Sequence, residues 1–122
     1  MTDKTILVID DDPIFSKLMS RLFKVKDIET DVSATGIHAL NLLKENHYDL
    51  VILDYYLPDI LGDEVLKFIK GNQSLDALPV VAVSSSTDDK IKNDMLQRGV
   101  NHFLSKPISK QSLKEIFVEF GI

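Results

Sequence analysis

Three short, continuous apolar runs, separated by amphipathic stretches, constrain the fold of this sequence more than any other feature. The runs are ILVI at 6–9, LVIL at 50–53 and VVAV at 80–83. Each is rich in β-branched residues and bounded by polar or turn-forming residues, which is typical of strands covered on both faces of a sheet. Two weaker segments, 28–32 and 102–104, are shorter or mixed in polarity, as edge strands tend to be. The sequence therefore predicts five strands.

Helical patterns follow each predicted strand. Asp12 and Ser109 are expected as N-caps, Pro13 fits a first helical turn, and Gly71 and Gly99 are expected at helix ends. The apolar stripes expected to face the core are Ile14, Leu18 and Leu22; Ile37, Leu40 and Leu43 within 36–46; Val65, Leu66 and Ile69 within 63–70; Ile91 and Met95 within 88–98; and Leu113, Ile116, Phe117 and Phe120 within 110–120.

Five strand–helix units in alternation predict an α/β fold with a parallel sheet and helices on both faces. The first, third and fourth strands are the most apolar and are expected in the middle of the sheet. Right-handed crossovers then favour the strand order 2-1-3-4-5, which is the order of flavodoxin-like folds. In that order the winding direction reverses between the first and third strands, where ligands bind beyond the carboxyl ends of the strands.

Length and composition exclude several classes of function. The chain has 122 residues, so we expect one domain over 1–122, and its mean hydropathy of +0.02 favours a soluble globular protein. A formal charge of −5 argues against binding nucleic acid through a basic face. No apolar run is long enough to span a membrane. There are no cysteines, which excludes thiol chemistry and suits a cytoplasmic protein.

Acidic side chains follow the first and third predicted strands. Asp10, Asp11 and Asp12 end one strand and Asp54 ends the other, so we expect these carboxylates to converge. Their repulsion calls for a compensating charge, and Mg²⁺ is the simplest candidate. Ser84 and Lys106, which follow the fourth and fifth strands, are expected at the same rim. Metal, ammonium and hydroxyl together suit a transferring phosphoryl group, with the Asp54 carboxylate as its nucleophile.

The order of these segments resembles the receiver domain of two-component response regulators, over nearly the whole chain. The matching segments are ILVIDDDP at 6–13, DLVILDYYLP at 49–58, PVVAVSS at 79–85 and LSKP at 104–107. Each acid, serine or lysine taken alone has an ordinary explanation as a capping or surface residue. Four motifs in order, at the ends of predicted strands, identify the chain as similar to this family.

The resemblance implies a role for each matching residue. Asp54 would be the phosphoacceptor. Asp11 would bind Mg²⁺ directly and Asp10 through water, and Tyr56 would contribute its backbone carbonyl. Asp12 matches a position that is not usually a ligand.

The resemblance also implies the parts of a switch. Ser84 would bind the phosphoryl group, and Lys106 would pair with its oxygens. Pro107 would follow Lys106 through a cis peptide bond. Phe103 matches the switch aromatic, often tyrosine, that turns inward on activation together with the Ser84 loop.

Four positions depart from the family or vary within it. Leu61 stands where aspartate is common, so the loop 58–62 is expected to differ in conformation. Phe103 lacks the hydroxyl of a switch tyrosine. Tyr56 and Ser86 stand where side chains influence the lifetime of the phosphoryl group.

The expected function is a signalling switch rather than an enzyme, with only self-catalysed phosphoryl acceptance and autodephosphorylation. The donor would be a histidine kinase or a histidine phosphotransfer protein that docks around Ile14, Phe15 and Leu18. A downstream protein or effector domain would bind the face formed by the fourth helix, fifth strand and fifth helix. The chain would act as a monomer or as a phosphorylation-dependent dimer.

Two other hypotheses stay open on the sequence alone. The first is a pseudo-receiver that binds its partner without phosphorylation, although the full set of acids, serine and lysine argues against it. The second is a Mg²⁺-dependent phosphatase with an aspartate nucleophile. Such enzymes typically need a second acid two residues after the nucleophile, where this chain has Tyr56. Nucleotide and flavin binding are disfavoured because no glycine-rich phosphate loop is present.

Overall fold

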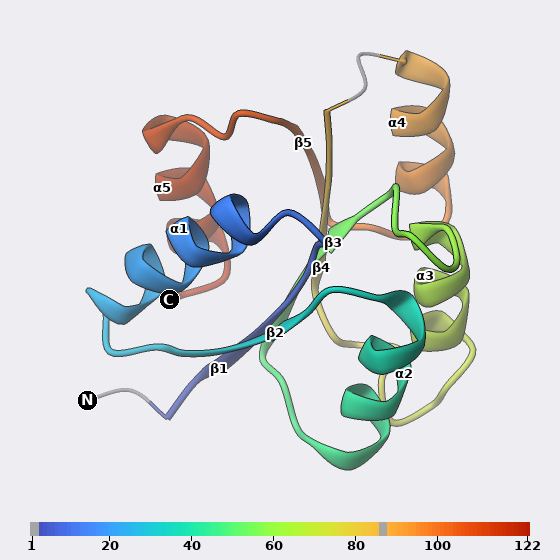
Figure 1. Cartoon of the computed structure of the whole chain (residues 1–122), viewed down its shortest axis with the longest axis horizontal. Coiled ribbons are helices and arrows are strands. Elements are labelled where there is room, and N and C mark those ends of the chain that lie inside the picture. Colours follow the sequence, from blue (N-terminus) through green and yellow to red (C-terminus); the bar gives the residue numbers. More distant parts are fainter. Residues whose placement is uncertain (1–2, 86–87) are drawn as a thin grey trace.

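The fold is a parallel sheet between two layers of helices, as Figure 1 shows. The computed structural model describes residues 3–85 and 88–122, and within them five strands alternate with five helices. The strands are β1 (Thr5–Ile9), β2 (Glu29–Ser33), β3 (Leu50–Asp54), β4 (Val80–Ser84) and β5 (His102–Ser105). The helices are α1 (Pro13–Lys24), α2 (Gly36–Glu45), α3 (Gly62–Lys70), α4 (Asp89–Gln97) and α5 (Lys110–Glu119).

The strand order is β2-β1-β3-β4-β5, and every pair is parallel, which confirms the predicted topology. Helices α1 and α5 cover one face of the sheet, and α2, α3 and α4 cover the other (Figure 1). Successive strand side chains point to opposite faces. Leu7 and Val51 therefore pack among α2, α3 and α4, whereas Ile6 and Ile52 pack among α1 and α5.

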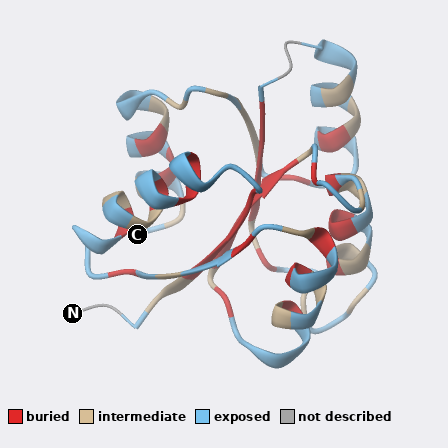
Figure 2. Cartoon of the chain, viewed as in Figure 1, coloured by how far each residue is buried: buried red, intermediate tan, exposed pale blue. Residues whose placement is uncertain are grey.

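Burial on both faces explains the continuous apolar runs of the central strands. Every residue of β3 and β4 is buried, whereas β2 at the edge of the sheet is mostly exposed. Figure 2 shows buried residues through the middle of the sheet and along the inner faces of the helices. None of the helices in the described ranges has the length and apolar character that crossing a bilayer requires.

The apolar stripe predicted for α1 is partly wrong: Leu22 packs against the core, but Ile14 and Leu18 do not face it. Ile14 is 79% exposed and Leu18 49% exposed. The buried positions of α1 are Phe15, Ser16, Met19 and Phe23. Both sets recur at helical spacing, so periodicity alone does not choose between two faces that differ by one residue. The buried face carries the larger side chains and fills the space between α1, α5 and the sheet. There the ring of Phe23 packs edge-on against Phe117 with centroids 5.6 Å apart.

The stripe predicted for α2 is also partly wrong. Ile37 is 52% exposed, and the buried positions are Gly36, Ala39 and Leu43. Small residues face inward here because the first turn of α2 lies against the loop that follows β3, where the side chain of Ile60 occupies the space that a Cβ on Gly36 would need.

The remaining helices follow their predicted faces and ends. The buried apolar positions are Val65, Leu66 and Ile69 in α3, Met95 in α4, and Leu113 and Ile116 in α5. Asp12 and Ser109 are N-caps, as predicted, and Gly71 is the C-cap of α3. Gly99 follows the C-cap of α4 and has φ of +108°, a conformation that favours glycine.

Candidate functional site

The carboxyl ends of β1 and β3 bring three carboxylates together, as the sequence predicts. Asp10, Asp11 and Asp54 each offer one oxygen, and these oxygens lie within 4.8 Å of one another. Asp10 and Asp54 are 1% and 6% exposed, whereas Asp11 is open to solvent. The three side chains form a half-buried acidic site at the point where the winding of the sheet reverses.

The fourth acid expected to converge, Asp12, caps the start of α1 instead of joining the three clustered carboxylates. Its carboxylate accepts a hydrogen bond from the N–H of Ile14 at 3.0 Å and so caps α1. The N–H of Asp12 in turn donates to Oδ1 of Asp10 at 2.9 Å. Asp12 therefore fixes the start of α1 and helps to orient Asp10.

Lys106 supplies a positive charge to the site. Its Nζ lies 2.6 Å from Oδ2 of Asp10 and 3.8 Å from Oδ2 of Asp54. Its backbone N–H donates to the carbonyl of Ser84 at 2.9 Å, which ties the end of β5 to the end of β4. The peptide bond from Lys106 to Pro107 is cis, as the resemblance implies.

A contact that the sequence does not predict joins Lys106 to Phe15. The ammonium lies 4.4 Å from the centroid of the Phe15 ring, a distance at which a cation and an aromatic face attract each other. Phe15 is only 7% exposed, so its predicted part in a docking surface is wrong, although Ile14 and Leu18 are exposed.

Ser84 lies on β4, which is next to β3, and Phe103 lies on β5 at the edge of the sheet. Ser84 is fully buried at the end of β4 and pairs with Ser105 of β5. Phe103 is partly buried, stands beside Ala82 in the β4–β5 register and packs against the core on the α2–α3–α4 face. Ser86, the other position expected to influence the phosphoryl group, lies outside the described residues.

The loop between β3 and α3 folds back onto the acidic site. The N–H of Tyr56 donates to Oδ1 of Asp54 at 3.2 Å, and Tyr56 forms an isolated antiparallel bridge with Leu61. The N–H of Gly62 donates to the carbonyl of Tyr55 at 2.6 Å. A Cβ on Gly62 would lie 2.6 Å from the carbonyl oxygen of Asp54, so this approach of backbone to backbone requires glycine.

The environment of Asp54 disfavours its charged form. Burial raises the pKa of Asp54 to about 6, and the neighbouring Asp10 carboxylate contributes to the same shift. The Lys106 ammonium and the Tyr56 N–H act in the opposite direction, and Asp11 adds a smaller increase. One ammonium therefore does not neutralise the three carboxylates.

The donor set fits a hard divalent cation. Carboxylate oxygens are the ligands that Mg²⁺ and similar ions prefer. Among the described residues, Oδ2 of Asp10 is buried and accepts no well-oriented hydrogen bond, and the Lys106 ammonium is its partner in an ion pair. The Lys106 ammonium pairs with Asp10 and Asp54, so the three carboxylates keep an excess of negative charge that a divalent ion would balance.

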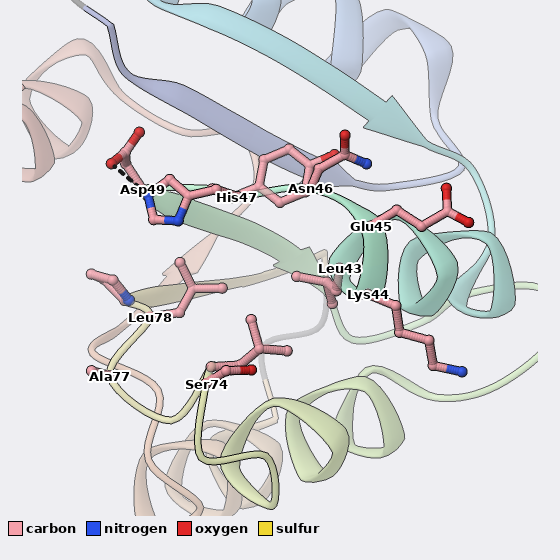
Figure 3. A pocket seen from close by; sticks show the side chains of 12 residues that line it. Leu43, Lys44, Glu45, Asn46, His47, Asp49, Ser74, Ala77 and Leu78 are labelled. Atoms are coloured by element: carbon pink, nitrogen blue, oxygen red, sulfur yellow. Dashed lines mark ion pairs between the residues drawn. The ribbon is translucent and has the colours of Figure 1, made fainter.

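A hollow lies at the end of the sheet opposite to the acidic site. It has a volume of about 520 Å³ and is lined by the segment from the end of α2 to the start of β3 and by the residues before β4, as Figure 3 shows. His47 and Asp49 on its rim form an ion pair with Nε2 and Oδ1 3.5 Å apart. Because it adjoins the amino ends of β3 and β4, this hollow is separate from the acidic site.

A parallel sheet with acids and a lysine at its carboxyl edge defines a class of phosphoryl-accepting α/β domains, and comparison with known proteins identifies the family. The family model of the response regulator receiver domain matches residues 6–118. The chain therefore belongs to the receiver domains of two-component response regulators, which are signalling switches that receive phosphoryl groups from histidine kinases and act on downstream effectors.

Individual relatives agree with this assignment. The polar-differentiation response regulator DivK of Brucella ovis is 33% identical over 106 residues, which are 87% of this chain and 86% of DivK. The receiver domain of the Francisella response regulator 1452 superposes with a TM-score of 0.83 at 28% identity, over 98% of this chain and 94% of that one. Response regulator Rcp1, solved in its Mn²⁺-bound form, has a TM-score of 0.82 at 28% identity over 93% and 88% of the two chains.

Proposed function

We propose that this chain is a phosphorylation-activated switch in which Asp54 accepts the phosphoryl group. The observation that carries the proposal is the position of the Asp54 carboxylate. It ends a central strand, is nearly buried, and lies 3.8 Å from the Lys106 ammonium and within 4.8 Å of oxygens of Asp10 and Asp11. Such a carboxylate is held in place and surrounded by groups that can balance the charge of an incoming phosphoryl group.

The donor in this proposal is a phosphohistidine of a histidine kinase or of a histidine phosphotransfer protein. An oxygen of Asp54 forms a bond to phosphorus while the bond between phosphorus and the imidazole nitrogen breaks. The imidazole leaves neutral because its other ring nitrogen carries a proton. The product is an aspartyl-phosphate, and attack of water on its phosphorus returns the carboxylate and inorganic phosphate.

Asp10, Asp11, Asp54 and the backbone carbonyl of Tyr56 would hold Mg²⁺, in agreement with the charge excess of the acidic cluster. The ion supplies charge neutralisation to the phosphoryl oxygens when it is bound. Lys106 pairs with a phosphoryl oxygen, and its place beside both Asp10 and Asp54 supports this role. The hydroxyl of Ser84, at the end of β4, donates a hydrogen bond to a phosphoryl oxygen.

The output of the switch is proposed to pass through α4, β5 and α5. Phosphorylation shifts an existing equilibrium in which Ser84 and the Phe103 side chain have two arrangements. Each of the two helices carries an exposed apolar side chain, Leu96 on α4 and Val118 on α5, which suits contact with a partner or with a second copy of the chain. The tie from Lys106 to the Ser84 carbonyl connects the acidic site to β5.

Intact-protein mass spectrometry tests the proposal. After incubation with Mg²⁺ and a small acyl-phosphate donor, the native protein should gain one phosphoryl group, and chelation of Mg²⁺ should prevent the gain. Asp54→Asn should gain none, because an amide oxygen is a poor nucleophile. Equal labelling of Asp54→Asn would exclude Asp54 as the acceptor. If neither the acyl phosphate nor a histidine kinase domain labels the native protein, the switch hypothesis is wrong.

A further inference from the structure

The carboxylate of Asp59 joins the loop after β3 to the start of α2. Its Oδ1 accepts a hydrogen bond from the N–H of Gly36 and its Oδ2 from the N–H of Ile37, both at 2.8 Å. These two amides begin a helix and have no partner within it. The N–H donors, that of Ile37 first, hold the pKa of Asp59 below its ordinary value, so the carboxylate stays charged beside the positive end of the helix.

The same loop carries the backbone of the candidate metal site. It leaves β3 at Asp54 and is closed at its base by the bridge between Tyr56 and Leu61. At its tip Asp59 contacts α2, and the side chain of Ile60 lies against Gly36, which has no Cβ to prevent the approach. The loop is therefore fixed at both base and tip, and Tyr56, whose carbonyl is the proposed ligand, lies at the base.

We propose that Asp59 is a positioning residue for the metal site, and that its clamp on Gly36 and Ile37 couples metal binding to the first turn of α2. The inference rests on the proposed function for the role of the Tyr56 carbonyl. Without the clamp, the tip of the loop loses its attachment to α2. The bridge to Leu61 and the bond from the Tyr56 N–H to Asp54 then hold the carbonyl of Tyr56 alone, so its position is less restricted. Because coupling is reciprocal, metal binding also stabilises the first turn of α2. Ile37 is 52% exposed, and its mobility thereby depends on whether the metal site is occupied.

A matched control is available at the same helix end. Thr35 is the N-cap of α2 and accepts a hydrogen bond from the N–H of His38 at 3.2 Å through its own hydroxyl. Thr35→Ala removes a capping bond of the same helix without touching the loop. Asp59→Ala removes both capping bonds and the link, and Asp59→Asn keeps one acceptor oxygen.

Titration of the ¹⁵N-labelled protein with Mg²⁺, followed by NMR at the amide of Tyr56, tests the proposal. Asp59→Ala should weaken Mg²⁺ binding about tenfold, the loss typical of groups that orient metal ligands. Asp59→Asn should fall between Asp59→Ala and the native protein, and Thr35→Ala should stay within about twofold of the native value. In the native protein, Mg²⁺ should also slow hydrogen exchange at the amide of Ile37, and in Asp59→Ala this effect should disappear.

Three outcomes would overturn the inference. Native Mg²⁺ affinity in Asp59→Ala would show that the clamp does not position the site. Equal losses in Asp59→Ala and Thr35→Ala would assign the effect to general weakening of α2. Asp11→Ala separates these results from a failure of the proposed function. If Asp11→Ala loses Mg²⁺ while Asp59→Ala keeps it, only the clamp is wrong; if Asp11→Ala binds Mg²⁺ as the native protein does, the metal site is wrong and the inference fails with it.

Discussion

Asp54 combines two properties that a phosphoacceptor must reconcile. It lies almost completely out of solvent, and in the proposed reaction it must be ionised to attack phosphorus. Burial and the Asp10 carboxylate raise its pKa to about 6, so near neutral pH the residue is mostly ionised at a cost in folding free energy. A group with a raised carboxyl pKa binds its proton more tightly in the folded state. Its contribution to stability therefore falls as the pH rises from about 4 to about 6.

Replacement of Asp54 by asparagine should remove this cost. In metal-free protein at pH 7.5 we expect Asp54→Asn to be more stable than the native protein by about 1–2 kcal/mol, after a reduction for solvent screening. The advantage should shrink as the pH falls toward about 4, where the native carboxyl is protonated. Urea unfolding at several pH values in the presence of a chelator measures the difference. A stability gain that is constant with pH would show that ionisation of Asp54 does not lower the free energy of unfolding.

Lys106 favours the ionised form of Asp54, although it lies closer to Asp10 than to Asp54. Lys106→Met removes the ammonium and keeps much of the apolar stem, so the pKa of the Asp54 carboxyl should rise above its native value. Carbon-13 NMR of labelled aspartate carboxyls follows this titration directly in metal-free protein. An unchanged Asp54 pKa would show that the Lys106 ammonium does not stabilise the ionised form of Asp54.

The helices show where sequence patterns are sufficient and where they are not. The strands and the ends of the helices follow from apolar runs, caps and glycines, because these are local signals. The sheet order follows from the relative polarity of the strands and the handedness of the crossovers. The buried face of α1 does not follow, since Ile14 and Leu18 recur with the same spacing as Phe15 and Met19. Only packing against the sheet distinguishes the two sets.

Single substitutions on α1 test the observed face. Met19 is 1% exposed and Leu18 is 49% exposed. Met19→Ala should lower the free energy of unfolding by about 2–3 kcal/mol because it leaves a cavity in the core. Leu18→Ala should cost less than about 1 kcal/mol. Chemical denaturation measures the two losses. A larger loss in Leu18→Ala than in Met19→Ala would show that the face predicted from the sequence is the buried one.

The site was predictable to the extent that it depends on strand ends. Asp10, Asp11, Asp54 and Lys106 converge because parallel strands end at one edge, and the family motifs named the same residues. The contacts of Phe15 and Asp59 were not predictable in this way. They join segments that are distant in the chain, and they depend on the register of α1 and on the path of one loop.

At the scale of the whole molecule, the site unites the ends of four strands. Asp10 follows β1, Asp54 ends β3, Ser84 ends β4 and Lys106 follows β5. The bond from the Lys106 N–H to the Ser84 carbonyl and the ion pair from its ammonium to Asp10 connect these ends across the sheet. We therefore expect a change in charge at Asp54 to act on several elements at once.

Metal binding should consequently stabilise the entire fold. At a Mg²⁺ concentration about 100 times the dissociation constant, the gain should be about 2.7 kcal/mol, because only the folded chain assembles the ligands. Asp11 is exposed, so Asp11→Ala should leave the metal-free stability nearly unchanged and abolish most of the gain. Thermal unfolding with and without Mg²⁺ compares the two proteins. An equal gain in Asp11→Ala would contradict the proposed ligand set.

Chemical identification of the phosphorylated residue tests the central claim most directly. Protein treated with Mg²⁺ and an acyl-phosphate donor would be reduced with borohydride, which converts an aspartyl-phosphate to homoserine, and then analysed by peptide mass spectrometry. The proposed mechanism predicts homoserine at position 54, its loss on chelation of Mg²⁺, and none at positions 10, 11 or 12. Homoserine at another aspartate, or a phosphoryl group that borohydride leaves in place on a different residue type, would contradict the account.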